Sequence, residues 1–174
     1  MIIIVGPDGA GKTTLAHKLA QRLPLEVRRP PQAERRETRN YKGVKEFVEE
    51  VIAEFPKYQS VVWDRFPIPD HFIYAGILPK KPDPQKAFRN TWKKLQRLED
   101  RLAELPILVV VPTAPLEVLL ARHKDPEVAA DDLKVLVERY RLWHALTPMT
   151  TMWVETDNVS HAVEEVVEWY NLHP

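Results

Sequence analysis

Short apolar runs alternate along the chain with longer stretches in which apolar residues recur every three or four positions. The short runs are rich in Val, Ile and Trp, which is typical of β-strands covered on both faces, and the longer stretches are typical of amphipathic helices. The expected strands are Ile2–Val5, Leu25–Val27, Ser60–Trp63, Ile107–Val111 and Met152–Val154. The expected helices are Lys12–Arg22, Val44–Phe55, Asp70–Gly76, Pro84–Leu105, Pro115–His123, Asp131–His144 and Ser160–Tyr170. This alternation predicts an α/β fold with a five-stranded parallel sheet between helices.

The 174 residues fit one domain, 1–174, without an internal repeat or a linker that would divide it. No apolar run is long enough to span a membrane and no basic-apolar signal precedes the first strand, so we expect a cytoplasmic protein without a membrane partner. The net charge at pH 7 is zero, so the surface as a whole does not attract nucleic acid. A nucleic-acid partner is therefore disfavoured, but it stays an alternative.

The first functional motif is a glycine-rich loop of the form G-x-x-x-x-G-K-S/T, which lies between an expected strand and an expected helix. Glycines let backbone amides turn inward around an anion, and the following helix adds the partial positive charge of its N-terminus. Lys12 is suited to bridge the β- and γ-phosphates of ATP, and Thr13 to offer its hydroxyl to Mg²⁺. ATP and Mg²⁺ are therefore the expected cofactors. The residues expected to bind the nucleotide are Gly6, Pro7, Asp8, Gly9, Ala10, Gly11, Lys12, Thr13 and Thr14.

The second motif follows the third expected strand, where Asp64 and Arg65 are adjacent. Ligands of open α/β sheets bind beyond the carboxyl ends of the strands, so we expect this pair beside the phosphate loop. A carboxylate there is suited to hold Mg²⁺ or to accept a proton from the attacking oxygen. An arginine is suited to hold a phosphate through two parallel hydrogen bonds. The alternative is a structural Asp–Arg pair at the end of a strand.

These two motifs resemble those of thymidylate kinases, in which an acid precedes G-x-G-K-S/T-T and a D-R-Y/F motif follows the third strand. The second motif is also similar, less closely, to the E-R-S motif of deoxynucleoside kinases. The resemblance implies a P-loop kinase-type three-layer sandwich with a short lid at about 122–132. It implies catalytic roles for Lys12, Asp64 and Arg65, and it places Asp8 near the sugar hydroxyl of the acceptor. For Asp8 the alternative is a hydrogen bond within the loop.

Outside the two motifs the chain departs from the thymidylate kinase pattern. That family continues with a serine and an A-Y-Q run, whereas here Tyr74 falls one position later than expected and Ala75 replaces the glutamine. Its R-E-P-G segment is echoed by Arg28-Arg29-Pro30-Pro31, which implies that Arg29 holds the acceptor phosphate. The missing glutamate and glycine put thymine selectivity in doubt more than kinase activity.

Residues 28–45 form a basic stretch where the family builds its monophosphate site. Tyr41 and Phe47 are candidates to stack on a base there, although a core position suits Phe47 better. The expected substrate-binding residues are Arg29, Tyr41, Phe47, Arg65 and Tyr74.

Pro115–Arg122 resembles the P-E-x-x-L-x-R segment that opens the lid of thymidylate kinases, where its arginine packs near adenine or phosphate. Arg122 matches that arginine, so the resemblance implies a cofactor-binding and catalytic role for it. The six histidines have no metal-ligand or triad spacing, and we interpret them as surface or core residues. The candidates to stabilise the charge of the transition state are Arg122, Lys124, Arg139 and Arg141.

The expected function is ATP-dependent phosphoryl transfer to a deoxynucleoside monophosphate. A deoxynucleoside kinase, or a kinase acting on a hydroxylated base in DNA, is an alternative that the departures allow. A nucleotide-dependent switch or assembly protein is an alternative of another class, but the D-R pair favours an acceptor and no guanine-reading N-K-x-D run occurs. The expected partner is a small-molecule nucleotide or nucleoside, and a homodimer is compatible with the sequence.

Overall fold

The computed structural model describes residues 1–30 and 41–173. Within these residues, five strands pair in parallel in the order β2-β3-β1-β4-β5. The strands are β1 (Ile2–Ile4), β2 (Glu26–Arg28), β3 (Val61–Asp64), β4 (Leu108–Thr113) and β5 (Thr151–Glu155). The helices are α1 (Lys12–Arg22), α3 (Tyr41–Ala53), the 3₁₀ helix η2 (Phe55–Tyr58), α4 (Pro67–Ile73), α5 (Pro84–Ala103), α6 (Leu116–Arg122), α7 (Ala130–Leu146) and α8 (Val159–Leu172). The expected α/β class and parallel sheet are confirmed.

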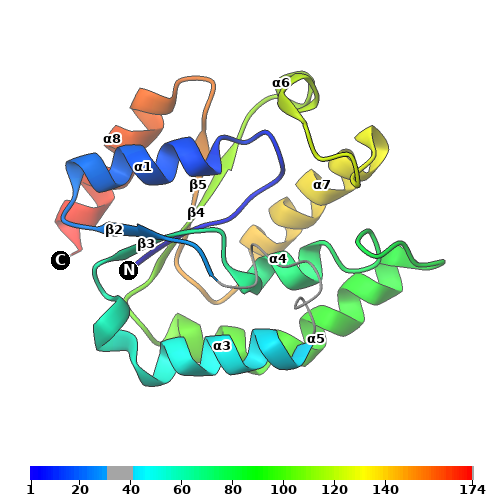
Figure 1. Cartoon of the computed structure of the whole chain (residues 1–174), viewed down its shortest axis with the longest axis horizontal. Helices are drawn as coiled ribbons and strands as arrows, with labels where there is room; N and C mark the ends of the chain where they lie inside the picture. Colours follow the sequence, from blue (N-terminus) through cyan, green and yellow to red (C-terminus); the bar gives the residue numbers. More distant parts are fainter. Residues whose placement is uncertain (31–40, 174) are drawn as a thin grey trace.

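Helices cover both faces of the sheet, which makes three layers (Figure 1). Successive residues of a strand point to opposite faces. Ile2 and Ile4 of β1 accordingly pack with Leu15 on the face covered by α1 and α8, whereas Ile3 packs with Trp63 on the face covered by α3, α4, α5 and α7. The sheet therefore separates two apolar cores, and the expected three-layer sandwich is confirmed.

Four helices, α3, α4, α7 and α8, begin earlier than the sequence pattern predicts. Helix α3 already includes Tyr41, and α4 covers Pro67–Ile73 rather than Asp70–Gly76. The early start of α4 is possible because proline is tolerated in the first turn of a helix. Helix α8 starts at Val159, where the side chain of Asn158 accepts a hydrogen bond of 3.2 Å from the His161 amide. Across the described residues, no helix is both long and apolar enough to cross a bilayer.

The register of the central strands brings three functional segments to one edge of the sheet. Ile4 of β1 pairs with Asp64 of β3, and Arg28 of β2 pairs with Trp63. The phosphate loop after β1, Arg29 after β2 and Asp64 at the end of β3 therefore meet at the carboxyl edge, where ligands of such sheets bind.

Candidate active site

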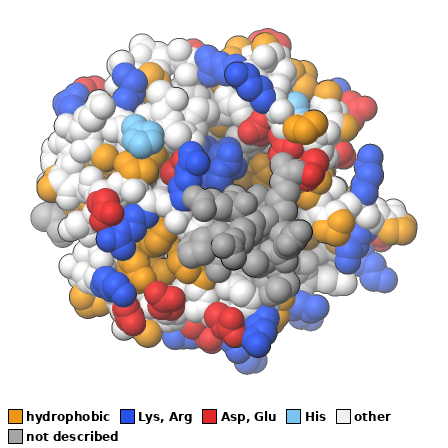
Figure 2. Space-filling view, viewed as in Figure 1, with side chains coloured by type: hydrophobic (Ala, Val, Ile, Leu, Met, Phe, Trp, Pro, Cys, Tyr) orange, Lys and Arg blue, Asp and Glu red, His pale blue; other side chains and the backbone are white. Residues whose placement is uncertain are grey.

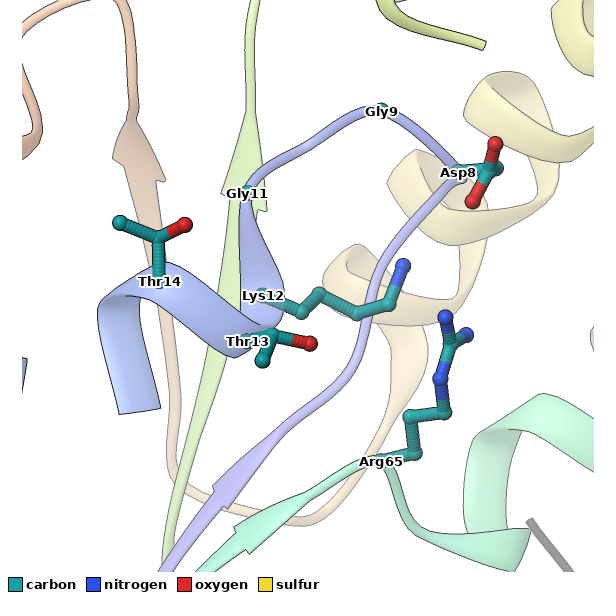
Figure 3. A pocket seen from close by; sticks show the side chains of 7 residues that line it. All are labelled: Asp8, Gly9, Gly11, Lys12, Thr13, Thr14 and Arg65. Atoms are coloured by element: carbon teal, nitrogen blue, oxygen red, sulfur yellow. The ribbon is translucent and has the colours of Figure 1, made fainter. Parts of the chain in front are cut away.

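The phosphate loop borders an open cavity of about 130 Å³ at this edge. Figure 3 shows the side chains of Lys12 and Arg65 pointing toward one another into it, with Asp8 on the loop above them. Figure 2 shows Lys and Arg side chains gathered near the centre of this face of the molecule. Two cations beside backbone amides and a helix N-terminus suit an anionic ligand. Of the described residues, those that line the cavity are Asp8, Gly9, Gly11, Lys12, Thr13, Thr14 and Arg65.

The loop is fixed on its outer side by α6. Gly9 has a φ of +79°, and a Cβ atom there would lie 2.8 Å from the Leu119 carbonyl oxygen and 3.3 Å from Cβ of Arg122. Only glycine fits this approach without a shift of the backbone. Arg122 thus lies beside the loop on an exposed turn of α6, next to the cavity but not among the residues named above.

Lys12 is buried beneath the loop, with 4% of its surface exposed. Its Nζ donates to the carbonyl oxygens of Gly6 (2.8 Å) and Pro7 (2.7 Å). Burial lowers the pKa of Lys12 to about 8, and the positive charge of Arg65 adds to the shift. The ammonium group therefore has two neutral acceptors where a phosphate would offer charged ones, so an anion in the cavity would be favoured.

Asp64 is fully buried, and two side chains meet one of its oxygens. Oδ2 accepts hydrogen bonds from the Thr13 hydroxyl at 2.9 Å and from Nε of Arg29 at 2.8 Å, and Nη2 of Arg29 forms an ion pair with it at 2.7 Å. Nη2 of Arg29 also lies 3.2 Å from the Thr13 hydroxyl oxygen. Oδ1 of Asp64 has no hydrogen-bond partner among the described residues. Arg29 is thus bound to Asp64, a pairing that the sequence did not predict.

Arg65 is held in a conformation that side chains rarely adopt. Its φ is +80°, in the left-handed region that costs a residue other than glycine about 1–3 kcal/mol. Burial opposes its charge, but Asp70 and Tyr74 raise the pKa of Arg65, so the guanidinium stays protonated. The Tyr140 hydroxyl donates to Asp70 at 2.7 Å. Strain that aims a cation into a cavity is typical of functional sites.

Asp8 is connected to the segment between α6 and α7. His123 Nδ1 lies 2.9 Å from Asp8 Oδ2, and its Nε2 lies 2.7 Å from the Val128 carbonyl oxygen. The Lys124 amide donates to the same Asp8 oxygen at 3.2 Å. Sequence reasoning missed His123, and the available signal was its position directly after Arg122 at the start of the expected lid. This segment, residues 123–129, is shorter than the predicted lid, because α7 already begins at Ala130.

The two aromatic residues that were candidates to stack on a base both lie on α3. Phe47 is 7% exposed and packs edge-on against Trp63, with ring centroids 5.4 Å apart, so it belongs to the core. Tyr41 is exposed on α3, and its hydroxyl lies 3.5 Å from the Lys94 carbonyl oxygen of α5. Neither residue lines the cavity. Part of the predicted basic stretch, with Arg35, Arg36 and Arg39, lies outside the described residues.

Arg139 serves the packing of the helices. Its guanidinium donates to three carbonyl oxygens, those of Ile73, Ala75 and Pro84, at 2.6–3.0 Å, and it lies 4.8 Å from the centre of the Phe88 ring. A cation held by so many buried contacts is not free to reach a transferring phosphoryl group. Arg139 is therefore unsuited to stabilise the charge of the transition state, whereas these contacts say nothing against the other three candidates.

The residues suited to Mg²⁺ are Thr13 and Asp64, which present a hydroxyl and a carboxylate within hydrogen-bond reach of each other. Oδ1 of Asp64 is a buried acceptor without a partner in the described part of the chain. No group of three or more His, Asp or Glu side chains there is placed to hold a metal by itself. Thr13 and Asp64 offer two oxygen ligands, and Mg²⁺ is commonly held by few protein oxygens together with phosphates and water.

Similarity to known proteins lies in structure rather than in sequence, because no protein-family model and no curated protein matches the chain. The YorR protein of Bacillus subtilis, solved with phosphorylated GDP, superposes with a TM-score of 0.69 at 19% identity over 98% of this chain and 95% of that one. Deoxyadenosine kinase of M. mycoides, solved with dATP, superposes with a TM-score of 0.66 at 17% identity over 98% of both chains. Thymidylate kinase of Candida albicans superposes with a TM-score of 0.62 at 18% identity over 99% and 92%. This chain therefore has the fold of the P-loop kinases, and its structural neighbours include deoxyadenosine kinase and thymidylate kinase.

Proposed function

We propose that this protein transfers the γ-phosphoryl group of ATP to a deoxynucleoside monophosphate. The observation that carries the proposal is the convergence of Lys12, Thr13, Asp64 and Arg65 at one edge of the sheet, around a cavity bordered by the phosphate loop. Phosphoryl transfer requires positioning and stabilisation of charge more than covalent help, and these residues supply both. The fold supports the proposal, because its structural neighbours include kinases of nucleosides and nucleotides.

In this proposal each residue acts on a defined part of the reaction. Lys12 exchanges its two loop carbonyls for phosphate oxygens of ATP. Thr13 and Asp64 would hold Mg²⁺, which would neutralise charge on the phosphates. Arg65 holds the acceptor beside the γ-phosphorus. The acceptor oxygen forms a bond to this phosphorus while the bond to the β,γ-bridging oxygen breaks, which leaves ADP.

A deoxynucleoside kinase is the second candidate, and the contact between Arg29 and Asp64 favours it. An arginine that is already bound to a buried carboxylate is less available as a clamp for an acceptor phosphate. A nucleoside presents no phosphate, so it needs no such clamp.

A substrate panel tests the proposed activity. The protein is mixed with ATP and Mg²⁺ and with deoxynucleosides, their monophosphates or short oligonucleotides, and ADP release is measured. We expect turnover with a monophosphate, and we expect Lys12→Ala to stay folded while it loses nearly all transfer. Absence of ADP release with every acceptor, or wild-type turnover in Lys12→Ala, contradicts the proposal.

Arg29→Ala distinguishes the two acceptors. A charge-assisted contact to a phosphate contributes about 1.5–3 kcal/mol, so its loss should raise the KM for dTMP roughly ten- to a hundredfold. The KM for thymidine should change little. Arg28→Ala is the matched control, because Arg28 is adjacent in sequence but pairs with Glu26 at 2.7 Å on the surface. Better turnover with thymidine than with dTMP, together with a silent Arg29→Ala, supports the nucleoside kinase instead.

A further inference from the structure

Arg29 occupies the same two oxygen-bearing side chains that are suited to a divalent cation. Its guanidinium contacts Asp64 Oδ2 through two nitrogens, at 2.8 and 2.7 Å, and Nη2 reaches the Thr13 hydroxyl oxygen at 3.2 Å. Arg29 therefore binds a carboxylate and a hydroxyl that belong to two elements, β3 and α1. A bound metal ion would bridge the same two oxygens and carry positive charge, as Arg29 does.

Because Asp64 is buried, its negative charge must be balanced by a nearby positive charge whether or not a ligand is bound. Its side chain has no exposed surface, and an ionised carboxylate removed from water is strongly destabilising unless a positive charge or hydrogen bonds compensate it. Arg29 supplies that charge in the structure. Lys12 is close, but its Nζ is bound to the carbonyl oxygens of Gly6 and Pro7.

The two side chains of this ion pair differ in how easily each can move away from the other. The side chain of Arg29 is 48% exposed, so its guanidinium can be rehydrated when another cation takes its place, whereas Asp64 is fixed in β3. Only Oδ2 of Asp64 is used, because Oδ1 has no partner in the described residues. An incoming cation therefore has to displace a partly solvated arginine from Oδ2, and Oδ1 is a buried carboxylate oxygen that no described residue already holds.

We infer that Arg29 substitutes for a divalent cation at Asp64 and Thr13, and that cation binding displaces it. The inference rests on the proposed function only in naming the metal as the one that accompanies the nucleotide. Competition at one site makes the coupling reciprocal: the metal releases Arg29, and any anion that binds Arg29 favours the metal. A released Arg29 becomes available to the phosphate of an acceptor, so the metal and a monophosphate each tighten the binding of the other.

Binding of Mn²⁺ alone tests the competition without any catalytic readout. The electron paramagnetic resonance signal of free Mn²⁺ is titrated with wild type, Arg29→Ala and Arg28→Ala. Arg29→Ala should bind Mn²⁺ about five- to a hundredfold more tightly than wild type, as expected for removal of a coupled competitor. Arg28→Ala removes the same charge one residue away and should bind Mn²⁺ as wild type does. If both variants bind Mn²⁺ more tightly to the same extent, the effect comes from the loss of positive charge in general, and the inference is overturned.

A double-mutant cycle locates the effect at Asp64. In an Asp64→Asn background Arg29 loses its partner, so Arg29→Ala should no longer tighten Mn²⁺ binding. Persistence of the effect in that background, or no Mn²⁺ binding by any variant, overturns the inference. Circular dichroism spectra establish that each variant is folded. A protein that binds Mn²⁺ as predicted but transfers no phosphate refutes the proposed function alone, whereas an active kinase in which Arg29→Ala leaves Mn²⁺ binding unchanged refutes this inference alone.

Discussion

Replacing His123 with alanine should destabilise the protein in a way that depends on pH. His123 bridges the phosphate loop and the segment before α7, through Asp8 at 2.9 Å and the Val128 carbonyl at 2.7 Å. An ionised carboxylate and a carbonyl only accept hydrogen bonds, so the imidazole makes both contacts only when both of its nitrogens carry protons. The bridge is therefore complete when His123 is positively charged and Asp8 is negatively charged.

The contribution of this bridge follows from its contacts and exposure. Hydrogen bonds to charged groups contribute about 1.5–3 kcal/mol when they are sheltered from water. The side chains of His123 and Asp8 are 13% and 25% exposed, so solvent screens part of the interaction. We therefore expect about 1–2 kcal/mol for the charged bridge. For a chain of this length that corresponds to a decrease in Tm of about 2–8 °C in His123→Ala.

The sign of the pH dependence follows from the two pKa shifts. Burial opposes the charged imidazole, but the bonds to Val128 and Asp8 raise the pKa of His123 above its ordinary 6.5, so its contribution is complete below pH 6.5 and is lost as pH rises through the folded pKa. Burial likewise opposes the ionised carboxylate, but the Lys124 amide and the charges of Lys12 and His123 lower the pKa of Asp8 below 3.8. Its contribution is complete above pH 3.8 and is lost as pH falls through the folded pKa. The bridge should therefore stabilise most between these two ordinary values.

Thermal unfolding at pH 5.5 and pH 9 measures this effect. The difference in Tm between wild type and His123→Ala should be largest at pH 5.5 and should shrink at pH 9, where only one of the two bonds can persist. His161→Ala is the control, because His161 is exposed on α8 and its Nε2 is 3.9 Å from Glu165. An equal loss of Tm at both pH values, or the same pattern in His161→Ala, refutes the reasoning.

Three further substitutions probe other parts of the molecule. Asp64→Asn should lower turnover by orders of magnitude while ATP binding weakens modestly; normal specific activity with a large loss of Tm would instead favour a structural Asp–Arg pair. Gly76→Ala should reduce stability by at least about 1–3 kcal/mol in urea unfolding, because Gly76 has a φ of +81° and a Cβ atom would lie 2.7 Å from Cα of Pro84; an unchanged midpoint would contradict this. Glu99→Gln should cost about 1–3 kcal/mol in the same assay, because the buried Glu99 oxygens accept from two indole N–H groups and a threonine hydroxyl that one amide oxygen cannot all satisfy; a Gln variant as stable as wild type would contradict it.

The features that were predicted correctly depend on local sequence. The phosphate loop is recognisable because its glycines, Lys12 and Thr13 are contiguous and lie between a strand and a helix. The core position of Phe47, which the sequence analysis preferred over stacking on a base, follows from the apolar spacing of its helix. The parallel direction of the strands follows from the alternation of strands and helices, and parallel strands bring the phosphate loop after β1 and Asp64 at the end of β3 to the same edge of the sheet.

The features that were missed depend on contacts between distant residues. Arg29 and Asp64 are separated by 35 positions, and their pairing depends on β2 being the edge strand beside β3. Asp8 and His123 are separated by 115 positions, and their contact requires α6 to pack against Gly9. Neither the choice of neighbouring strand nor the approach of a helix to a loop is encoded in hydrophobic periodicity, so one sequence could not provide them.

The contacts of the charged groups show how the proposed phosphate site can stay folded without phosphate. Lys12 is held by loop carbonyls, Asp64 by Arg29, and Asp8 by His123, so each of these buried or half-buried charges has a partner within the protein. Such partners offset the cost of burying charge, and they must be exchanged when phosphates bind. Ligand affinity therefore reflects a difference between two sets of contacts, and substitutions of the protein-side partners should strengthen binding of whichever ion they compete with. Arg29 is the partner where this exchange is most direct, since its guanidinium already spans the carboxylate and the hydroxyl that a metal ion would use.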